Sequence, residues 1–157
     1  MRAKSGFTLV EILIVVVILG ILAAIVIPQF TEASTEAKTS SLVSDLQTVR
    51  AQIQMYKIQH LDQLPTAGGL DFVTAMTTYT QQDGTSAASQ APADGVYGPY
   101  LNKMPSNQFV TTAANQALVL PQATTPAAPT GATGWFFNTT TGDFRANDTT
   151  DPNHFNL

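Results

Sequence analysis

The stretch GFTLVEILIVVVILGILAAIVIP, residues 6–28, decides the fold of this chain. Within residues 7–27 every side chain is apolar except at three positions, Thr8, Glu11 and Gly20. A helix needs about 20 consecutive, predominantly apolar residues to cross the hydrocarbon core of a bilayer. Since a helix also satisfies its own backbone hydrogen bonds in lipid, the stretch predicts a membrane-spanning helix over residues 7–27.

A short basic segment precedes the apolar run. Arg2 and Lys4 are expected to stay on the cytoplasmic side of the membrane and to place the rest of the chain on the far side. A secretory signal has a short apolar core followed by a small-residue cleavage site. Here the apolar run is longer and amphipathic sequence follows it, so an ordinary secretory signal is not expected.

Glu11 is the unusual residue of the apolar run. A carboxylate inside such a helix costs about 2.5–3.5 kcal/mol on insertion scales. One interpretation is a charge close enough to the helix end to reach the lipid headgroups. The other is a carboxylate that meets a positive partner inside the membrane.

The segment KSGFTLVEILIVVVILGILAAIVIP resembles the class III prepilin signal, which type IV pilins and type II secretion pseudopilins share. The matching positions are the basic leader, Gly6, Phe7, Thr8, Leu9, Glu11, Gly20 and Pro28. The resemblance implies that a prepilin peptidase removes residues 1–6 by cutting between Gly6 and Phe7 on the cytoplasmic face. N-methylation of Phe7 would follow.

The composition fits one membrane helix and one small domain in 157 residues. The formal net charge is -4, and loss of Arg2 and Lys4 with the leader would make the mature chain more acidic. An acidic chain has no electrostatic footprint for nucleic acid, so no nucleic-acid partner is expected. The chain has no cysteine and therefore no disulfide, whereas many major type IV pilins close a C-terminal loop with a cysteine pair.

Helical periodicity continues beyond Pro28, where a kink is expected. Apolar and aromatic residues recur at helical spacing on one face, at Leu42, Leu46, Val49, Ile53, Tyr56 and His60. A helix over residues 7–60 would be roughly 80 Å long. Such a rod is too long for a globule of this size, so its front half needs lipid or other copies of the chain.

Gly20 and Pro28 bracket the weakest part of this helix, because glycine and proline have the poorest helix propensities. An ordinary membrane-helix glycine and an interfacial kink would account for both residues in a single subunit. The resemblance adds that the stretch between such residues can unwind when subunits pack into a filament.

The predicted fold class is α+β, with the long kinked helix packed against a small antiparallel sheet in residues 61–157. Breakers at Pro65, Gly68 and Gly69 end the helix. The remaining predicted elements are a short helix in 70–79 with Phe72, Val73 and Met76 facing inward, a strand at 117–120, and a hairpin of 135–138 with 143–146 turning at Thr141 and Gly142. The sheet is expected to bury Leu46, Val49 and Ile53 against Trp135, Phe137 and Phe144.

Catalysis is not expected. The two histidines, His60 and His154, lie far apart and belong to no metalloprotease, nucleophile-elbow or phosphate-loop pattern. Calcium is a weaker alternative for the polar cluster near the C-terminus, Asp143, Asn147, Asp148 and Asp151. This cluster lacks the acidic loop typical of major pseudopilins, so a solvated polar tail without a cofactor is the preferred interpretation.

The remaining chemistry is assembly. After cleavage, the Phe7 amine of one subunit can pair with the Glu11 carboxylate of a staggered neighbour, which satisfies both charges where water is scarce. The resemblance therefore implies a helical homo-oligomer, with a prepilin peptidase, an inner-membrane assembly platform and minor pilins or pseudopilins as partners. The subunit would sit in the inner membrane, surrounded by lipid, until it joins a periplasmic or extracellular filament.

Three features favour the major pseudopilin of a type II secretion system. They are the absence of cysteine, the LPT…GGL turn at residues 64–70, and the GPYLNKMP segment at residues 98–105. A major type IV pilin, serving adhesion, twitching motility or DNA uptake, is the alternative. The missing acidic loop and two Thr/Ala/Pro-rich stretches keep that alternative open. A monomeric membrane-anchored binding domain is a third class, which predicts neither processing nor a filament.

Overall fold

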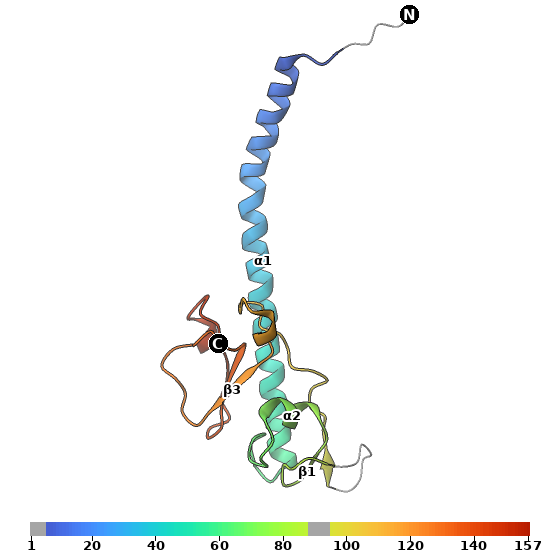
Figure 1. Ribbon diagram of the computed structural model, residues 1–157, viewed down its shortest axis with the longest axis vertical. Coiled ribbons are helices and arrows are strands. Elements are labelled where there is room, and N and C mark those ends of the chain that lie inside the picture. The colour runs from blue at the N-terminus through green and yellow to red at the C-terminus, as the bar shows by residue number, and fades with distance from the viewer. Residues whose placement is uncertain (1–5, 88–94) are drawn as a thin grey trace, which may run out of the picture. The chain divides into compact units, whose positions relative to one another are not determined.

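The computed structural model describes residues 6–87 and 95–157 (Figure 1). The chain divides into two compact units, one ending at Thr39 and the other beginning at Ser40. The helix α1, Leu9–Gln59, contributes residues to both units. The predicted helix over residues 7–60 is therefore confirmed to within two residues, and it continues through Pro28.

The C-terminal end of α1 is formed by two residues in the left-handed region. Leu61 and Asp62 have φ values of 53° and 65°. Asp62 N–H donates to the carbonyl of Lys57 at 2.9 Å and so satisfies one of the carbonyls that the last turn leaves open. The helical path thus ends three residues before the first predicted breaker, Pro65.

The C-terminal unit contains short elements joined by turns. They are α2 (Phe72–Thr77), β1 (Thr80–Gln81), β2 (Val96–Tyr97), a 3₁₀ turn (Ala113–Asn115), β3 (Val119–Gln122), β4 (Trp135–Asn138), β5 (Phe144–Ala146) and a second 3₁₀ turn (His154–Asn156). The predicted second helix is confirmed, and Phe72 and Met76 are buried as expected. Val73 is only partly buried, while Ala75 lies in the core.

The main sheet has the strand order β3-β4-β5, and a separate antiparallel pair joins β1 to β2. The hairpin of β4 and β5 is confirmed, with Phe137 opposite Phe144 and Gly142 at a φ of 78° in the turn. The sheet is not purely antiparallel, however, because β3 pairs with β4 in parallel. Residues 123–134 return the chain to the start of β4, and Pro121 is tolerated because β3 is an edge strand.

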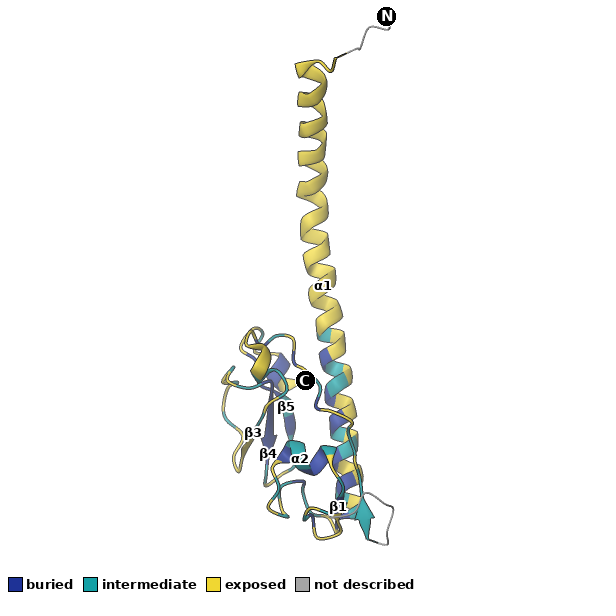
Figure 2. Cartoon of the chain, turned by 45° about the vertical axis from the view of Figure 1, so that its right-hand side comes forward, coloured by how far each residue is buried: buried dark blue, intermediate teal, exposed yellow. Residues whose placement is uncertain are grey.

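The core of the C-terminal unit forms where one face of α1 meets the sheet and α2 (Figure 2). The residues predicted to share the inward face are all buried, with at most 3 % of their surface exposed: Leu42, Leu46, Val49, Ile53 and Tyr56 in α1, and His60 directly after it. All of them except His60 share one cluster with Phe72, Trp135, Phe137 and Phe144. The predicted contact between helix and hairpin is therefore confirmed.

The polar tail after β5 is packed, so the prediction of a solvated tail is wrong. Asn147, Asp148, His154 and Phe155 are all buried. The Asp148 carboxylate accepts a hydrogen bond from Asn107 Nδ2 at 3.1 Å and lies 3.0 Å from Nδ1 of His154. The physical reason is β4, which is buried on both faces, so Phe136 also needs cover and Phe155 lies beside it.

His60 is held as a buried, neutral imidazole at the end of α1. Its Nδ1 lies 2.9 Å from the Tyr56 carbonyl and its Nε2 lies 2.9 Å from Oγ1 of Thr80. Because a carbonyl only accepts, Nδ1 carries the proton and Nε2 accepts from the Thr80 hydroxyl. Burial lowers the pKa of His60 below its ordinary value, and its hydrogen bonds only partly oppose this effect.

The free energy of unfolding is therefore expected to fall on acidification. The unfolded chain binds a proton at His60 below about pH 6.5, whereas the folded chain resists it. Stability is fully present above that pH and declines below it. Denaturant titrations of the full chain in detergent at pH 8 and pH 5.5 measure the difference. That difference should shrink in His60→Gln, and an unchanged difference would contradict this role of His60.

Candidate processing and assembly site

Thr8 and Glu11 together begin α1. Thr8 precedes the first helical residue, and its Oγ1 accepts a hydrogen bond from the Glu11 backbone N–H at 3.3 Å. Its carbonyl accepts from Ile12 N–H, also at 3.3 Å. Thr8 is thus the N-cap and Glu11 the third helical residue, which is the T-x-x-E spacing of a capping box.

The position of Glu11 in the first turn behind the Thr8 cap was missed from the sequence, although the T-x-x-E spacing is visible in it. A carboxylate in the first turn also interacts favourably with the positive end of the helix dipole. The hydrogen bond to Thr8 uses the Glu11 backbone N–H, so the carboxylate can support the first turn through the helix dipole while it also serves assembly. An experiment on Glu11 has to separate the two.

The proposed cleavage point lies in accessible chain. Gly6 and Phe7 precede α1, and Phe7 has 76 % of its surface exposed. No heavy atom lies within 4 Å of the position that a Cβ of residue 6 would occupy. The peptide bond between the two residues is therefore outside the helix and open to an enzyme.

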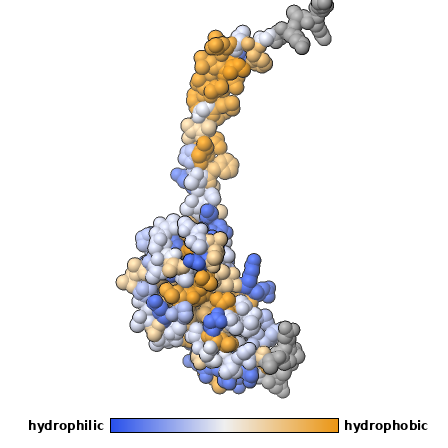
Figure 3. All heavy atoms as spheres, viewed as in Figure 1, coloured by the Kyte–Doolittle hydropathy of each residue, from blue (hydrophilic) through white to orange (hydrophobic). Residues whose placement is uncertain are grey.

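The apolar half of α1 has no cover within its own chain. Figure 3 shows the hydrophobic surface over this part of the helix. The helix is long and apolar enough to cross a membrane, and none of its most apolar window is buried. The exposed fractions run from 43 % at Val26 to 82 % at Leu9. So much exposed apolar surface requires lipid or other protein chains.

Gly20 and Pro28 lie inside an unbroken helix. No heavy atom lies within 4 Å of a Cβ built on Gly20, so packing within this chain does not require a glycine there. Pro28 has no backbone N–H, so the carbonyl four residues earlier loses its usual helical hydrogen bond. Unwinding between these two residues stays a prediction.

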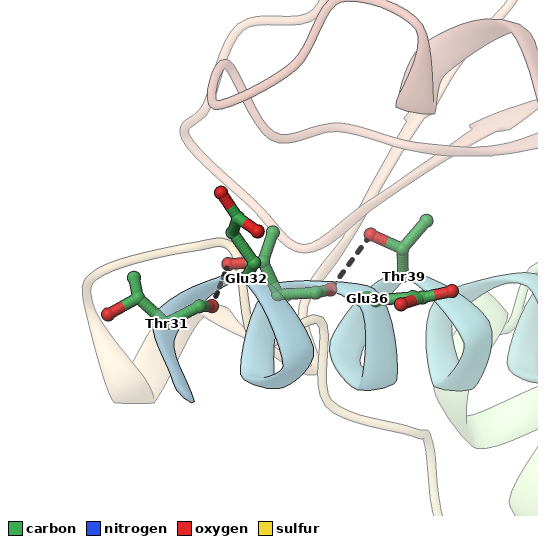
Figure 4. Close-up of a pocket in the computed structure, with 5 residues that line it drawn as sticks. Thr31, Glu32, Glu36 and Thr39 are labelled. Atoms are coloured by element: carbon green, nitrogen blue, oxygen red, sulfur yellow. Dashed lines mark hydrogen bonds between the residues drawn. The ribbon is translucent and has the colours of Figure 1, made fainter. Parts of the chain in front are cut away.

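The segment after Pro28 carries a shallow groove lined by three threonines and two glutamates (Figure 4). Each threonine hydroxyl donates to the carbonyl four residues earlier, at 3.2 Å for Thr31, 3.0 Å for Thr35 and 3.1 Å for Thr39. The hydroxyls are thereby satisfied within the helix. Glu32 and Glu36, which line the same groove, are exposed.

The four side chains considered for calcium have separate protein partners. Asp143 pairs with Arg145 and Asp148 with His154, while Asn147 donates to two threonine hydroxyls and Asp151 accepts from Asn153 N–H. Within residues 6–87 and 95–157, no cluster of three or more His, Cys, Asp or Glu side chains is arranged to hold a metal ion.

Comparison with known proteins places these features in a family. Residues 1–27 match the family described as the prokaryotic N-terminal methylation motif. The chain is 38 % identical over 104 residues to type II secretion system core protein G of Pseudomonas aeruginosa, covering 66 % of this chain and 67 % of that protein. It is 32 % identical over 108 residues to core protein G of Aeromonas hydrophila, covering 69 % of each chain.

A shorter similarity reaches the pilins. A fimbrial protein of Pseudomonas aeruginosa is 44 % identical over 50 residues, which are 32 % of each chain. No solved structure matches this chain. Because the similarity to core protein G extends over about two thirds of both chains, whereas the fimbrial match covers only a third, the chain belongs to the family of type II secretion system core protein G.

Proposed function

We propose that this chain is a structural subunit that polymerises into a helical filament, as the major pseudopilin of a type II secretion system. The exposed apolar half of α1, directly behind a processing motif, is the observation that carries the proposal. A helix of this kind is stable in lipid as a monomer, and it is equally well covered by identical helices in a fibre. The subunit therefore has no need of catalytic residues.

In this proposal a prepilin peptidase removes residues 1–6 at the cytoplasmic face, and Phe7 becomes the N-methylated first residue. The subunit then waits in the inner membrane with its C-terminal unit outside the cytoplasm. An assembly platform lifts it into the growing filament, which minor pseudopilins begin. Family membership and the matched N-terminal motif support this sequence of events.

The proposal is tested by expressing the full chain with a type II secretion system and its prepilin peptidase. Sheared filaments are imaged, and the intact mass of their subunit is measured. A filament whose subunit begins at methylated Phe7 is expected. A processed chain that stays monomeric in the membrane would contradict the proposal.

A surface pilus is the second candidate, and the similarity to a fimbrial protein favours it. The two candidates differ in where the filament is found. Electron microscopy of intact cells at natural expression levels should show no long surface fibre for a pseudopilin. Long fibres built of this chain would favour the pilus.

Gly20→Ala and Pro28→Ala test whether α1 unwinds during assembly. Alanine stabilises a helix by about 1 kcal/mol relative to glycine and about 3 kcal/mol relative to proline. If residues 20–28 must unwind, both variants should insert and be processed normally but yield fewer filaments, with the larger loss for Pro28→Ala. Wild-type yield in both variants, quantified from sheared filaments, would show that the helix stays intact.

A further inference from the structure

We infer that Glu32 and Glu36 form a binding face for Lys38 of a second copy of the chain, and that this contact sets the stagger between neighbouring subunits. The inference rests on the proposed function, since it requires a polymer. It concerns the polar segment behind the membrane span, which the Phe7–Glu11 pairing leaves without a role.

The two glutamates are a pair of like charges on one side of the helix. They are four residues apart, so their carboxylates are neighbours and repel each other. Both side chains are exposed, and neither belongs to any ion pair found among the described residues. A cation placed between them would relieve the repulsion.

Lys38 is the nearest cation in sequence, and it cannot serve its own glutamates well. At about 100° per residue, it lies about 160° around the helix axis from Glu36 and about 120° from Glu32. It is exposed and takes part in none of the ion pairs of the described residues. The segment therefore carries an acidic face, formed by Glu32 and Glu36, and a single positive charge, Lys38, on a different side of the helix.

Such a helix is complementary to a parallel copy of itself. The acidic face of one copy contacts Lys38 of the next. Such a contact leaves Lys38 of the first copy and the acidic face of the second free to bind further copies. Contacts between two different faces are heterologous and propagate without closing when the symmetry is helical. The threonine hydroxyls beside the glutamates bond to their own backbone, so they leave the carboxylates available to the incoming lysine.

The contact also fixes an axial offset. Lys38 lies four residues beyond the midpoint of Glu32 and Glu36, so the copy that supplies the glutamates is displaced by about 6 Å along the axis. The Phe7 amine needs the same displacement, in the same direction, to reach Glu11 four residues further along. One axial displacement thus satisfies both charge pairs. The two pairs can form with the same neighbouring subunit or with two neighbours that have the same displacement.

Charge reversal with complementation tests the inference in the full chain. Lys38→Glu makes both faces acidic, and the double variant Glu32→Lys with Glu36→Lys makes both faces basic. Each variant alone should lower the yield of sheared filaments at least about tenfold, because like charges then meet at every contact. Co-expression of the two should restore filaments that contain both chains in equal amounts. Lys38→Arg is the control that should assemble normally.

The outcomes separate this inference from the proposed function. If wild type forms no filament, both fail. If wild type forms filaments and the reversed variants assemble equally well alone, only the Lys38 contact is wrong. Loss of assembly without restoration on co-expression also overturns it, because the defect would then be unrelated to complementary charge.

Cross-linking provides a second measurement, since the chain has no native cysteine. Chains with Lys38→Cys and chains with Glu36→Cys, co-expressed and oxidised within filaments, should form a disulfide-linked dimer. Ser34→Cys in place of Glu36→Cys is the matched control. Residue 34 lies at the same height as Lys38 of the staggered copy but on the side of the helix away from the glutamates. Equal cross-linking of both pairs would contradict the proposed face.

Discussion

Glu11→Ala is expected to insert into the membrane and to lose its leader normally, yet to form almost no filaments. Breaking a buried ion pair by removing one partner costs about 3–5 kcal/mol, because the other charge stays buried and uncompensated. In this case the remaining charge is the Phe7 amine. Such a loss at every subunit contact corresponds to a decrease in filament yield of about a hundredfold or more.

Glu11→Gln separates assembly from helix capping. Glutamine occupies the third helical position of a capping box as well as glutamate does, so the first turn of α1 is retained. If Glu11 acts through its charge, alanine and glutamine variants should both fail to assemble. Filaments from Glu11→Gln but not from Glu11→Ala would show that the residue serves only to begin the helix. Membrane fractionation and intact mass confirm insertion and cleavage in each variant.

Trp135→Ala is expected to cause the largest loss of stability in the C-terminal unit. Trp135, in β4, is fully buried in the core cluster that includes α1, its ring centroid lies 5.3 Å from that of Phe144, and its Nε1 donates to the Pro105 carbonyl at 2.8 Å. Removing a large aromatic side chain from a core costs about 3–5 kcal/mol. The variant also leaves the Pro105 carbonyl without its donor.

Trp135→Phe is the matched control for that variant. Phenylalanine keeps an aromatic ring in the core and removes only the indole donor and part of the volume, so a smaller loss is expected. Denaturant unfolding of the full chain in detergent, followed by circular dichroism, measures both. A Trp135→Ala chain as stable as wild type would contradict the assignment of this residue to the core.

The long helix and the core could be predicted from the sequence because both depend on periodicity. The 4, 3, 4, 3, 4 spacing from Leu42 to His60 places those side chains on one face, whatever covers them. The hairpin of β4 and β5 carried its own turn signal in Gly142. The processing motif was recognised because its residues lie together in the chain.

The features that were missed depend on contacts between distant residues or on hydrogen-bond geometry. The parallel pairing of β3 with β4 follows from the path of residues 123–134, which contains no periodic signal. The buried tail could not be predicted, since Asp148 is acceptable in a core only because partners distant in sequence or brought round by the tail, Asn107 and His154, bond to its carboxylate. The Thr8 cap with Glu11 in its first turn was missed because the interpretation of Glu11 considered only its charge in an apolar run.

A high-resolution structure of the filament, determined by electron cryomicroscopy, tests the central claim most directly. The measurement is the distance from the first backbone nitrogen of one subunit to the nearest carboxylate oxygen of another. The pairing of Phe7 with Glu11 predicts a subunit that begins at Phe7 and a distance within ion-pair range. A chain that begins at Met1, or a Glu11 carboxylate that contacts only its own helix or lipid, would contradict it.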